Sequence, residues 1–164
     1  MNDFKQDISV KELFSMYSDM IYRIAFARTG NRYDAEDIME NTFLKYIKCN
    51  KKFREEEHRK AWLLKVTVNS CNSFFTSGWS KHRAQLDDAR EISYSTEFEK
   101  SEVYYAVAAL PEKYRVVVHL FYYEEMSIEE ICEILGAKES TVKSQLHRAR
   151  EKLKEILKEE QYEF

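Results

Sequence analysis

The sequence predicts an all-α protein made of two small helical domains joined by a flexible linker, the C-terminal domain being a helix-turn-helix. Only 3 Gly and 1 Pro occur in 164 residues, which is too few for the many turns of a β-rich fold. Apolar residues recur at steps of three and four along most of the chain, which is the period of a helix. The expected boundaries are 1–83, 84–100 and 101–164.

The first domain is expected to hold three helices. An apolar stripe from Leu13 to Ala25 predicts the first, and Gly30 interrupts its pattern. The second spans about 34–48 and opens with acidic residues, which the helix dipole favours in a first turn. The third begins at Ala61, after the polar segment "CNKKFREEEHR" has broken the period.

The acidic segment 84–100, "AQLDDAREISYSTEFEK", has no sustained apolar period and is interpreted as the linker. A short helix from about Ser101 to Leu110 opens the second domain. Pro111 suits the first position of the next helix, which runs to about Tyr123. The residues of this helix expected to point inward are Tyr114, Val117, Val118, Phe121 and Tyr122.

The segment "SIEEICEILGAKESTVKSQLHRAREKL" predicts a helix, a tight turn and a second helix. Ser127 and Glu130 have the spacing of a capping box, which begins a helix. Gly136 stands where a helix C-terminus needs a positive φ. Cys132 and Val142 are expected to pack where the two helices cross.

The exposed face of the second helix is basic, as in helices that enter the DNA major groove. The alternative is a helical hairpin whose charged face is only solvated. The candidate DNA-binding residues of this helix are Lys143, Ser144, Gln145, His147, Arg148 and Arg150.

Charge is distributed unevenly along the chain. The formal net charge of −3 argues against a nucleic-acid-binding protein. Residues 45–83, however, hold 10 basic and 3 acidic residues, and 138–158 hold 7 and 3. Two basic blocks between acidic ones suit two separate contacts with a polyanion, although ordinary solvated helix faces give a similar pattern.

Several other classes of protein are not supported by the residues. Three widely spaced cysteines, without a secretory leader, indicate reduced thiols in a cytoplasmic protein. The histidines show no ligand spacing with the cysteines, so no metal is expected, and we expect no other cofactor. There is no glycine-rich phosphate loop and no nucleophile arrangement, so we expect no enzyme. The chain has no run of 18 apolar residues, so membrane insertion is not expected.

Three stretches in this order resemble the bacterial sigma factors of RNA polymerase, in particular the extracytoplasmic-function group. They are "YDAEDIMENTFLKYI" (33–47), "KAWLLKVTVNSCNSFF" (60–75) and "ALPEKYRVVVHLFYYEEMSIEEICEILGAKESTVKSQLHRARE" (109–151). The resemblance implies that the first domain is sigma region 2, which binds the clamp helices of the largest polymerase subunit and melts the minus-ten element. The second would be region 4, which binds the flap of the second-largest subunit and reads the minus-35 element.

The resemblance also implies residue roles. The polymerase contacts would be Asp37, Glu40, Asn41 and Leu44, although the family more often has Glu where this chain has Asn41. Asn69 would line the pocket for a flipped base, with Phe53 and Arg54 as its other wall. The cations expected to follow the phosphates of minus-ten DNA are Lys48, Lys51, Lys52, Arg59, Lys60, Lys65, Lys81 and Arg83.

The partners implied are core RNA polymerase, promoter DNA and an anti-sigma factor. The alternative is a helix-turn-helix regulator that does not act through core polymerase.

Overall fold

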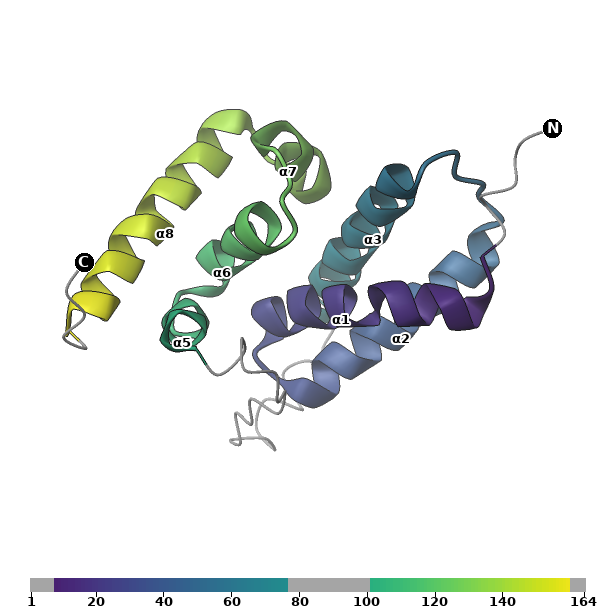
Figure 1. Ribbon diagram of the computed structural model, residues 1–164, viewed down its shortest axis with the longest axis horizontal. Helices are drawn as coiled ribbons and strands as arrows, with labels where there is room; N and C mark the ends of the chain where they lie inside the picture. The colour runs from purple at the N-terminus through teal and green to yellow at the C-terminus, as the bar shows by residue number, and fades with distance from the viewer. Residues whose placement is uncertain (1–7, 77–100, 160–164) are drawn as a thin grey trace. The chain divides into compact units, whose positions relative to one another are not determined.

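The computed structural model describes residues 8–76 and 101–159, and the described helices form two compact units (Figure 1). Unit 1 contains α1 (Val10–Thr29), α2 (Arg32–Cys49) and α3 (Glu56–Thr76). Unit 2 contains α5 (Glu102–Ala108), α6 (Glu112–Val118), a π-helix (His119–Tyr123), α7 (Ile128–Leu135) and α8 (Glu139–Glu159). The described residues include no strand, so the all-α class is confirmed. The predicted linker, 84–100, lies outside them.

In unit 1 each of the three helices packs against the other two. Ser9 caps α1 by accepting a hydrogen bond from the Glu12 N–H at 3.1 Å, and Asn31 caps α2 in the same way through Asp34 at 3.0 Å. α1 ends at Gly30, whose φ is 68°, as its position in the sequence predicted. These local signals leave very short connections, which hold the three helices in one bundle.

The third helix begins five residues earlier than the apolar period predicted. α3 starts at Glu56 rather than Ala61, because the polar segment "EEHRK" forms its first turn. Acidic residues are favoured there by the helix dipole. Arg59 supplies the buried contact of that turn, with a relative exposure of 1%. The spacing of apolar residues cannot identify a charged residue at a core position.

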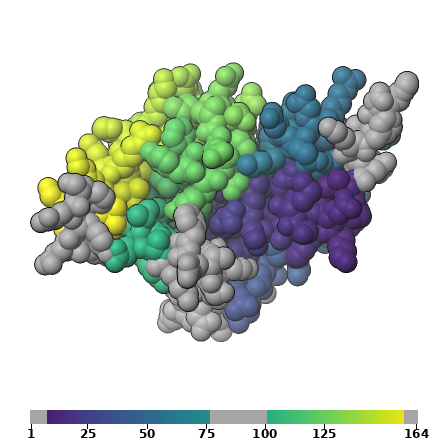
Figure 2. Space-filling view, viewed as in Figure 1, coloured from purple at the N-terminus to yellow at the C-terminus, as the bar shows by residue number. Residues whose placement is uncertain are grey.

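In unit 2 the helices α5, α6 and α7 all contact α8. In Figure 2 the green atoms of α6 and α7 adjoin the yellow atoms of α8. The core cluster that joins α5, α6 and α8 consists of Val107, Leu110, Tyr114, Val118 and Ala149. α7 completes the unit through its buried residues Ile131 and Ile134.

The helix after Pro111 is α-helical only as far as Val118 and continues as a π-helix. The Glu124 N–H bonds to the His119 carbonyl, five residues back, at 3.0 Å. This wider turn changes the direction of the side chains that follow it. Tyr122, predicted to point inward, is therefore exposed, whereas Tyr114, Val117 and Val118 are buried as expected.

The turn between α7 and α8 generates the first testable prediction. A Cβ placed on Gly136 meets no atom within 4 Å, so only its φ of 64° opposes a side chain. Gly136→Ala should therefore lower the free energy of unfolding by about 1 kcal/mol through left-handed strain alone. Urea unfolding of the full chain, followed by circular dichroism, measures this loss.

Gly136→Asn is the matched variant, because Asn tolerates the left-handed region better than Ala. It should recover part of the lost stability. Equal losses in the two variants would mean that the bulk of the side chain, and not the backbone angle, is what this turn excludes.

Candidate nucleic-acid interface

The turn that presents α8 is built as the sequence predicted. The Ser127 hydroxyl accepts from the Glu130 N–H at 3.1 Å, and the Glu130 carboxylate accepts from the Ser127 N–H at 3.1 Å. Gly136 ends α7 in the left-handed region, and its N–H bonds to the Cys132 carbonyl. Val142 is completely buried at the crossing. Capping and packing together determine which side of α8 faces solvent.

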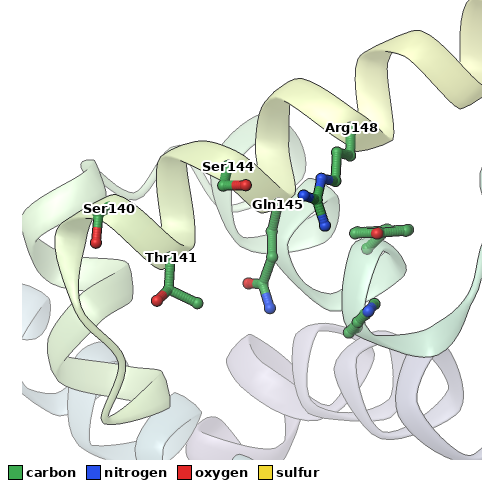
Figure 3. Close-up of a pocket in the computed structure, with 7 residues that line it drawn as sticks. Ser140, Thr141, Ser144, Gln145 and Arg148 are labelled. Atoms are coloured by element: carbon green, nitrogen blue, oxygen red, sulfur yellow. The ribbon is translucent and has the colours of Figure 1, made fainter.

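One side of α8 forms a pocket with the start of α6. Its volume is about 390 Å³. Figure 3 shows Thr141, Gln145 and Arg148 pointing to the same side of the helix. The residues that line the pocket are Lys113, Tyr114, Ser140, Thr141, Ser144, Gln145 and Arg148.

Three of the predicted residues, Ser144, Gln145 and Arg148, lie together in this pocket. The other four lining residues were not among the predicted DNA-binding residues. Ser140 and Thr141 stand one turn before Ser144 and Gln145, so helical spacing could have found them. Lys113 and Tyr114 come from α6, and their place beside α8 depends on tertiary packing, which no local pattern reports.

Tyr114 and Arg148 line the same pocket. A hydrogen bond from Arg148 lowers the pKa of the Tyr114 hydroxyl, and the nearby Lys113 acts in the same direction. The aromatic ring of Tyr114 belongs to the core cluster, so its hydroxyl is a fixed acceptor. The Tyr114 hydroxyl is therefore an acceptor within the fold that is available to Arg148.

Lys143 and His147 lie on an exposed face of α8 and are paired with acidic residues. The Lys143 ammonium lies 2.7 Å from the Glu139 carboxylate, and this hydrogen bond raises the Lys143 pKa. His147 Nε2 lies 3.2 Å from Glu151 Oε1. Exposed i,i+4 pairs of this kind are weak, so both side chains can exchange their partners for phosphate.

Arg150 lies on a different side of α8 from Arg148. It is two residues from Arg148 and thus points about 200° away around the helix. Its Nε donates to the Tyr122 hydroxyl at 2.6 Å, and its Cζ lies 5.6 Å from the ring centroid of Phe121. The π-helix therefore holds Arg150 on the side of α8 away from the pocket.

The four residues predicted to bind polymerase lie along α2. Asp37 is half-buried, and Glu40, Asn41 and Leu44 are exposed. Leu44 is 52% exposed, and Ile47, one turn further, is 49% exposed. Two exposed aliphatic side chains on one helix, next to acidic and amide groups, form a surface suited to another protein.

Phe53 is a core residue, which corrects the expectation that its ring is an exposed wall of a base pocket. It is 5% exposed. Its ring stacks on Tyr46 at a centroid distance of 6.0 Å and meets Trp62 edge-on at 5.8 Å. With both neighbours in place the ring has no open face for a base.

Arg59 is likewise buried, so in this fold it does not follow DNA phosphates as predicted. Its Nε donates to the Tyr46 hydroxyl at 3.1 Å, and its Nη1 is paired with Glu56. The Tyr17 hydroxyl donates to the same Glu56 carboxylate, and burial raises the Tyr17 pKa. One guanidinium thus connects α2 with α3 and, through Glu56, with α1.

The remaining minus-ten candidates have different degrees of exposure. Arg54, Lys65 and Asn69 are exposed, and Lys60 is half-buried. Lys65 and Asn69 are four residues apart on α3 and therefore share a face. Two further candidates, Lys81 and Arg83, lie outside the described residues.

In residues 8–76 and 101–159, no three His, Cys, Asp or Glu side chains are grouped so that they could hold a metal ion. No helix there combines the length and the apolar character needed to span a membrane.

Unit 1 is a bundle of three helices, and unit 2 contains a helix-turn-helix. The second helix of that motif, α8, exposes polar and basic side chains. These features define a two-module DNA-binding protein. Comparison with known proteins identifies the class further. Residues 13–81 match the family described as Sigma-70 region 2, and residues 100–153 match Sigma-70, region 4.

Relatives agree with this match. The chain is 31% identical over 131 residues to the RNA polymerase sigma factor SigV of Bacillus subtilis, covering 78% of each. It is 26% identical over 166 residues to the ECF RNA polymerase sigma factor SigW of the same organism, covering 90% of this chain and 88% of SigW. The chain belongs to the sigma-70 family of RNA polymerase sigma factors, in its extracytoplasmic-function group. This family consists of DNA-binding transcription initiation factors and is not a known class of enzymes.

Solved structures share the fold. The sigma factor RpoE, in complex with the anti-sigma factor NepR from Bartonella quintana, has a TM-score of 0.67 at 20% identity, covering 90% of this chain and 96% of that chain. CnrH, in complex with the cytosolic domain of CnrY, has a TM-score of 0.58 at 20% identity, covering 91% and 87%.

The buried network around Arg59 generates a second prediction. Arg59→Lys keeps the charge but loses the guanidinium fork that reaches Tyr46 and Glu56 together. We expect the free energy of unfolding to fall by about 2 kcal/mol, the value of hydrogen bonds to a charged group, as measured by urea unfolding.

Arg54→Lys is the control, because Arg54 is exposed in the loop before α3. It should change stability by no more than about 0.5 kcal/mol. If Arg59→Lys left stability intact but weakened DNA binding, Arg59 would return to the phosphate-binding role predicted from the sequence.

Proposed function

We propose that this sigma factor directs promoter-specific initiation by binding core RNA polymerase through α2, reading the minus-35 element with α8 and capturing the melted minus-ten strand with α3. The observation that carries this proposal is the side of α8 on which the exposed Ser144 and Arg148 and the half-buried Gln145 line one pocket. A capped turn orients that side, and the Tyr114 hydroxyl offers its arginine an acceptor.

At the minus-35 element, α8 enters the major groove, whose width of about 12 Å admits a helix. Gln145 and Arg148 are side chains that make paired hydrogen bonds to adenine and guanine edges. The hydroxyls of Ser140, Thr141 and Ser144 donate to phosphates near the start of the helix, which fixes the register without reading sequence.

At the minus-ten element, Asn69 contacts the edge of a base removed from the duplex. Unstacking a base costs a few kcal/mol, so the protein must supply contacts that offset it. The exposed Lys65, on the same face of α3, and Arg54, in the preceding loop, neutralise the backbone. Phe53 acts beneath this surface by packing against Trp62, since its own ring is buried.

Core polymerase docks on α2, and its clamp helices meet the face that carries Asp37, Glu40, Asn41 and Leu44. Leu44 supplies apolar contact, and the carboxylates pair with basic residues of the polymerase. Unit 2 binds the flap of the second-largest subunit. The sigma factor works in the cytoplasm, where core polymerase is, and has no catalytic activity, metal or cofactor of its own.

An anti-sigma factor is the proposed regulator. Support comes from the related RpoE, which was solved in complex with the anti-sigma factor NepR. The exposed apolar side chains of α2 are suited to such a partner as well as to polymerase, so the two would compete for one surface.

The minus-35 assignment gives a third prediction. Arg148→Ala should weaken holoenzyme binding to the preferred minus-35 sequence by about 1 to 3 kcal/mol and reduce discrimination against altered sequences, because a base contact is lost. Competition binding between preferred and altered duplexes measures both effects.

Arg150→Ala is the control within the same helix. Arg150 points away from the pocket, so any loss should be similar for every sequence. The assignment of Arg148 fails if its variant also loses affinity equally on all duplexes, which is the behaviour of a phosphate contact.

The docking assignment gives a fourth prediction. Leu44→Asp should weaken the complex with core polymerase by at least about tenfold, because a carboxylate in an apolar interface must be desolvated. Helicity should not change, since the Leu44 side chain is already exposed. Size-exclusion chromatography with core polymerase and circular dichroism test the two parts.

Asn69→Ala is the reciprocal variant. It should form the complex with core polymerase normally but reduce run-off transcription from a promoter, because it loses a base contact and no docking contact. Normal polymerase binding by Leu44→Asp would remove the docking assignment, and equal loss of binding and transcription in Asn69→Ala would indicate misfolding.

A further inference from the structure

The C-terminal turn of α1 is joined to the end of α3 by an arginine. Arg28 Nη2 donates a hydrogen bond to Asn72 Oδ1 at 2.9 Å. Its Cζ lies 4.8 Å from the ring centroid of Phe75. Phe75 is itself braced by Phe74, whose ring meets it edge-on at a centroid distance of 5.4 Å. The guanidinium is thus held by an amide on one helix turn and by a ring on the next.

This arrangement differs from ordinary core packing. Phe74 is 5% exposed and belongs to the core of unit 1, whereas Phe75 is 38% exposed. Arg28 is half-buried. A guanidinium that packs near an exposed phenylalanine ring places a planar cationic group beside an apolar one at the molecular surface.

The cluster continues the face of α3 assigned to the melted strand. Asn72 follows Asn69 by one helical turn, and both side chains are exposed. Around the helix, Asn72 is about 60° from Asn69, and Phe75 is about 60° further in the same direction. Arg28, which is bonded to Asn72, therefore lies one helical turn from the Asn69 site.

We propose that Arg28, held by Phe75 and Asn72, is a second base-stacking site for single-stranded DNA beside Asn69. This inference rests on the proposed function of unit 1. Bases stack on arginine guanidinium planes as well as on aromatic rings, and the guanidinium also attracts the strand electrostatically. Phe75 and Asn72 are positioning residues, because they fix the plane on which the base lies.

Single-stranded DNA is favoured over a protein partner by the chemistry of the surface. The Arg28 guanidinium is both planar and positively charged. It therefore suits a nucleotide, which has a flat base and a negatively charged phosphate. Asn69, one helical turn before Asn72, is exposed and polar, and Lys65 lies one turn further along α3 and is exposed and basic. Residues 45–83, which include all of α3, have 10 basic against 3 acidic residues.

The test uses holoenzyme assembled from core polymerase and the full chain, with two DNA probes. One is a fully paired promoter duplex, and the other has an unpaired, mismatched bubble across the minus-ten element. The variants are Arg28→Lys, which keeps the charge without the plane, and Phe75→Leu, which removes the support. Arg32→Lys is the matched control, because Arg32 is an exposed arginine paired with Glu36 on α2.

Arg28→Lys and Phe75→Leu should each lower affinity for the bubble probe about fivefold or more, the effect of losing one stacked base. Affinity for the paired duplex and for core polymerase should be unchanged, as should the bubble affinity of Arg32→Lys. Phe75→Tyr, which restores a ring, should retain the affinity of the parent protein.

Other outcomes overturn the proposal. If Arg28→Lys binds the bubble probe with full affinity and Arg28→Ala binds it more weakly, the Arg28 side chain contacts only a phosphate and stacks on no base. Weaker binding to core polymerase in Phe75→Leu would make this surface a protein-docking site. If both variants bind the bubble normally while Asn69→Ala does not, the stacking site is wrong and the proposed function stands. If the parent holoenzyme shows no preference for the bubble, the proposed function fails first.

Discussion

The fold of both units depends on where the backbone can leave a right-handed helix. Among the described residues, positive φ values occur at Gly30, Asn50, Glu125 and Gly136. These residues follow α1, α2, the π-helix region and α7, so the chain changes direction at or next to each of them. When a left-handed residue ends a helix, the angle between that helix and the next segment is restricted. The faces that α2, α3 and α8 expose are consequences of these few backbone angles.

Much of this could be predicted from the sequence because the signals are local. The capping box at Ser127 and the glycine at 136 act on neighbouring backbone groups, and each was found from spacing alone. Arg59 and Phe53 were misjudged because the groups that bury them, Tyr46 among them, come from another helix. A resemblance transfers the position of a residue, but the exposure of its side chain depends on tertiary packing.

Arginines held by aromatic side chains recur in both units. Tyr46 and Phe53 hold Arg59, Phe75 holds Arg28, and Tyr122 holds Arg150. An arginine that is already ordered loses less conformational entropy on binding than a free one. Where the guanidinium is buried, this pairing of an arginine with an aromatic side chain stabilises the fold. Where the guanidinium reaches the surface, it is available for recognition. Exposure, and not residue type, separates the two uses.

The chain as a whole has a formal charge of −3, so its net field does not attract DNA, and recognition must come from small oriented surfaces. Among the described residues, the surfaces of α3 and α8 that are proposed to bind DNA carry few exposed cations, which makes either contact weak alone. In the proposed function, core polymerase binds both units and so converts the second DNA contact into an intramolecular one, which multiplies the two affinities. Because each unit then binds DNA with only modest affinity, the free protein is not trapped on nonspecific DNA. For the same reason, promoter choice requires both elements to be present together.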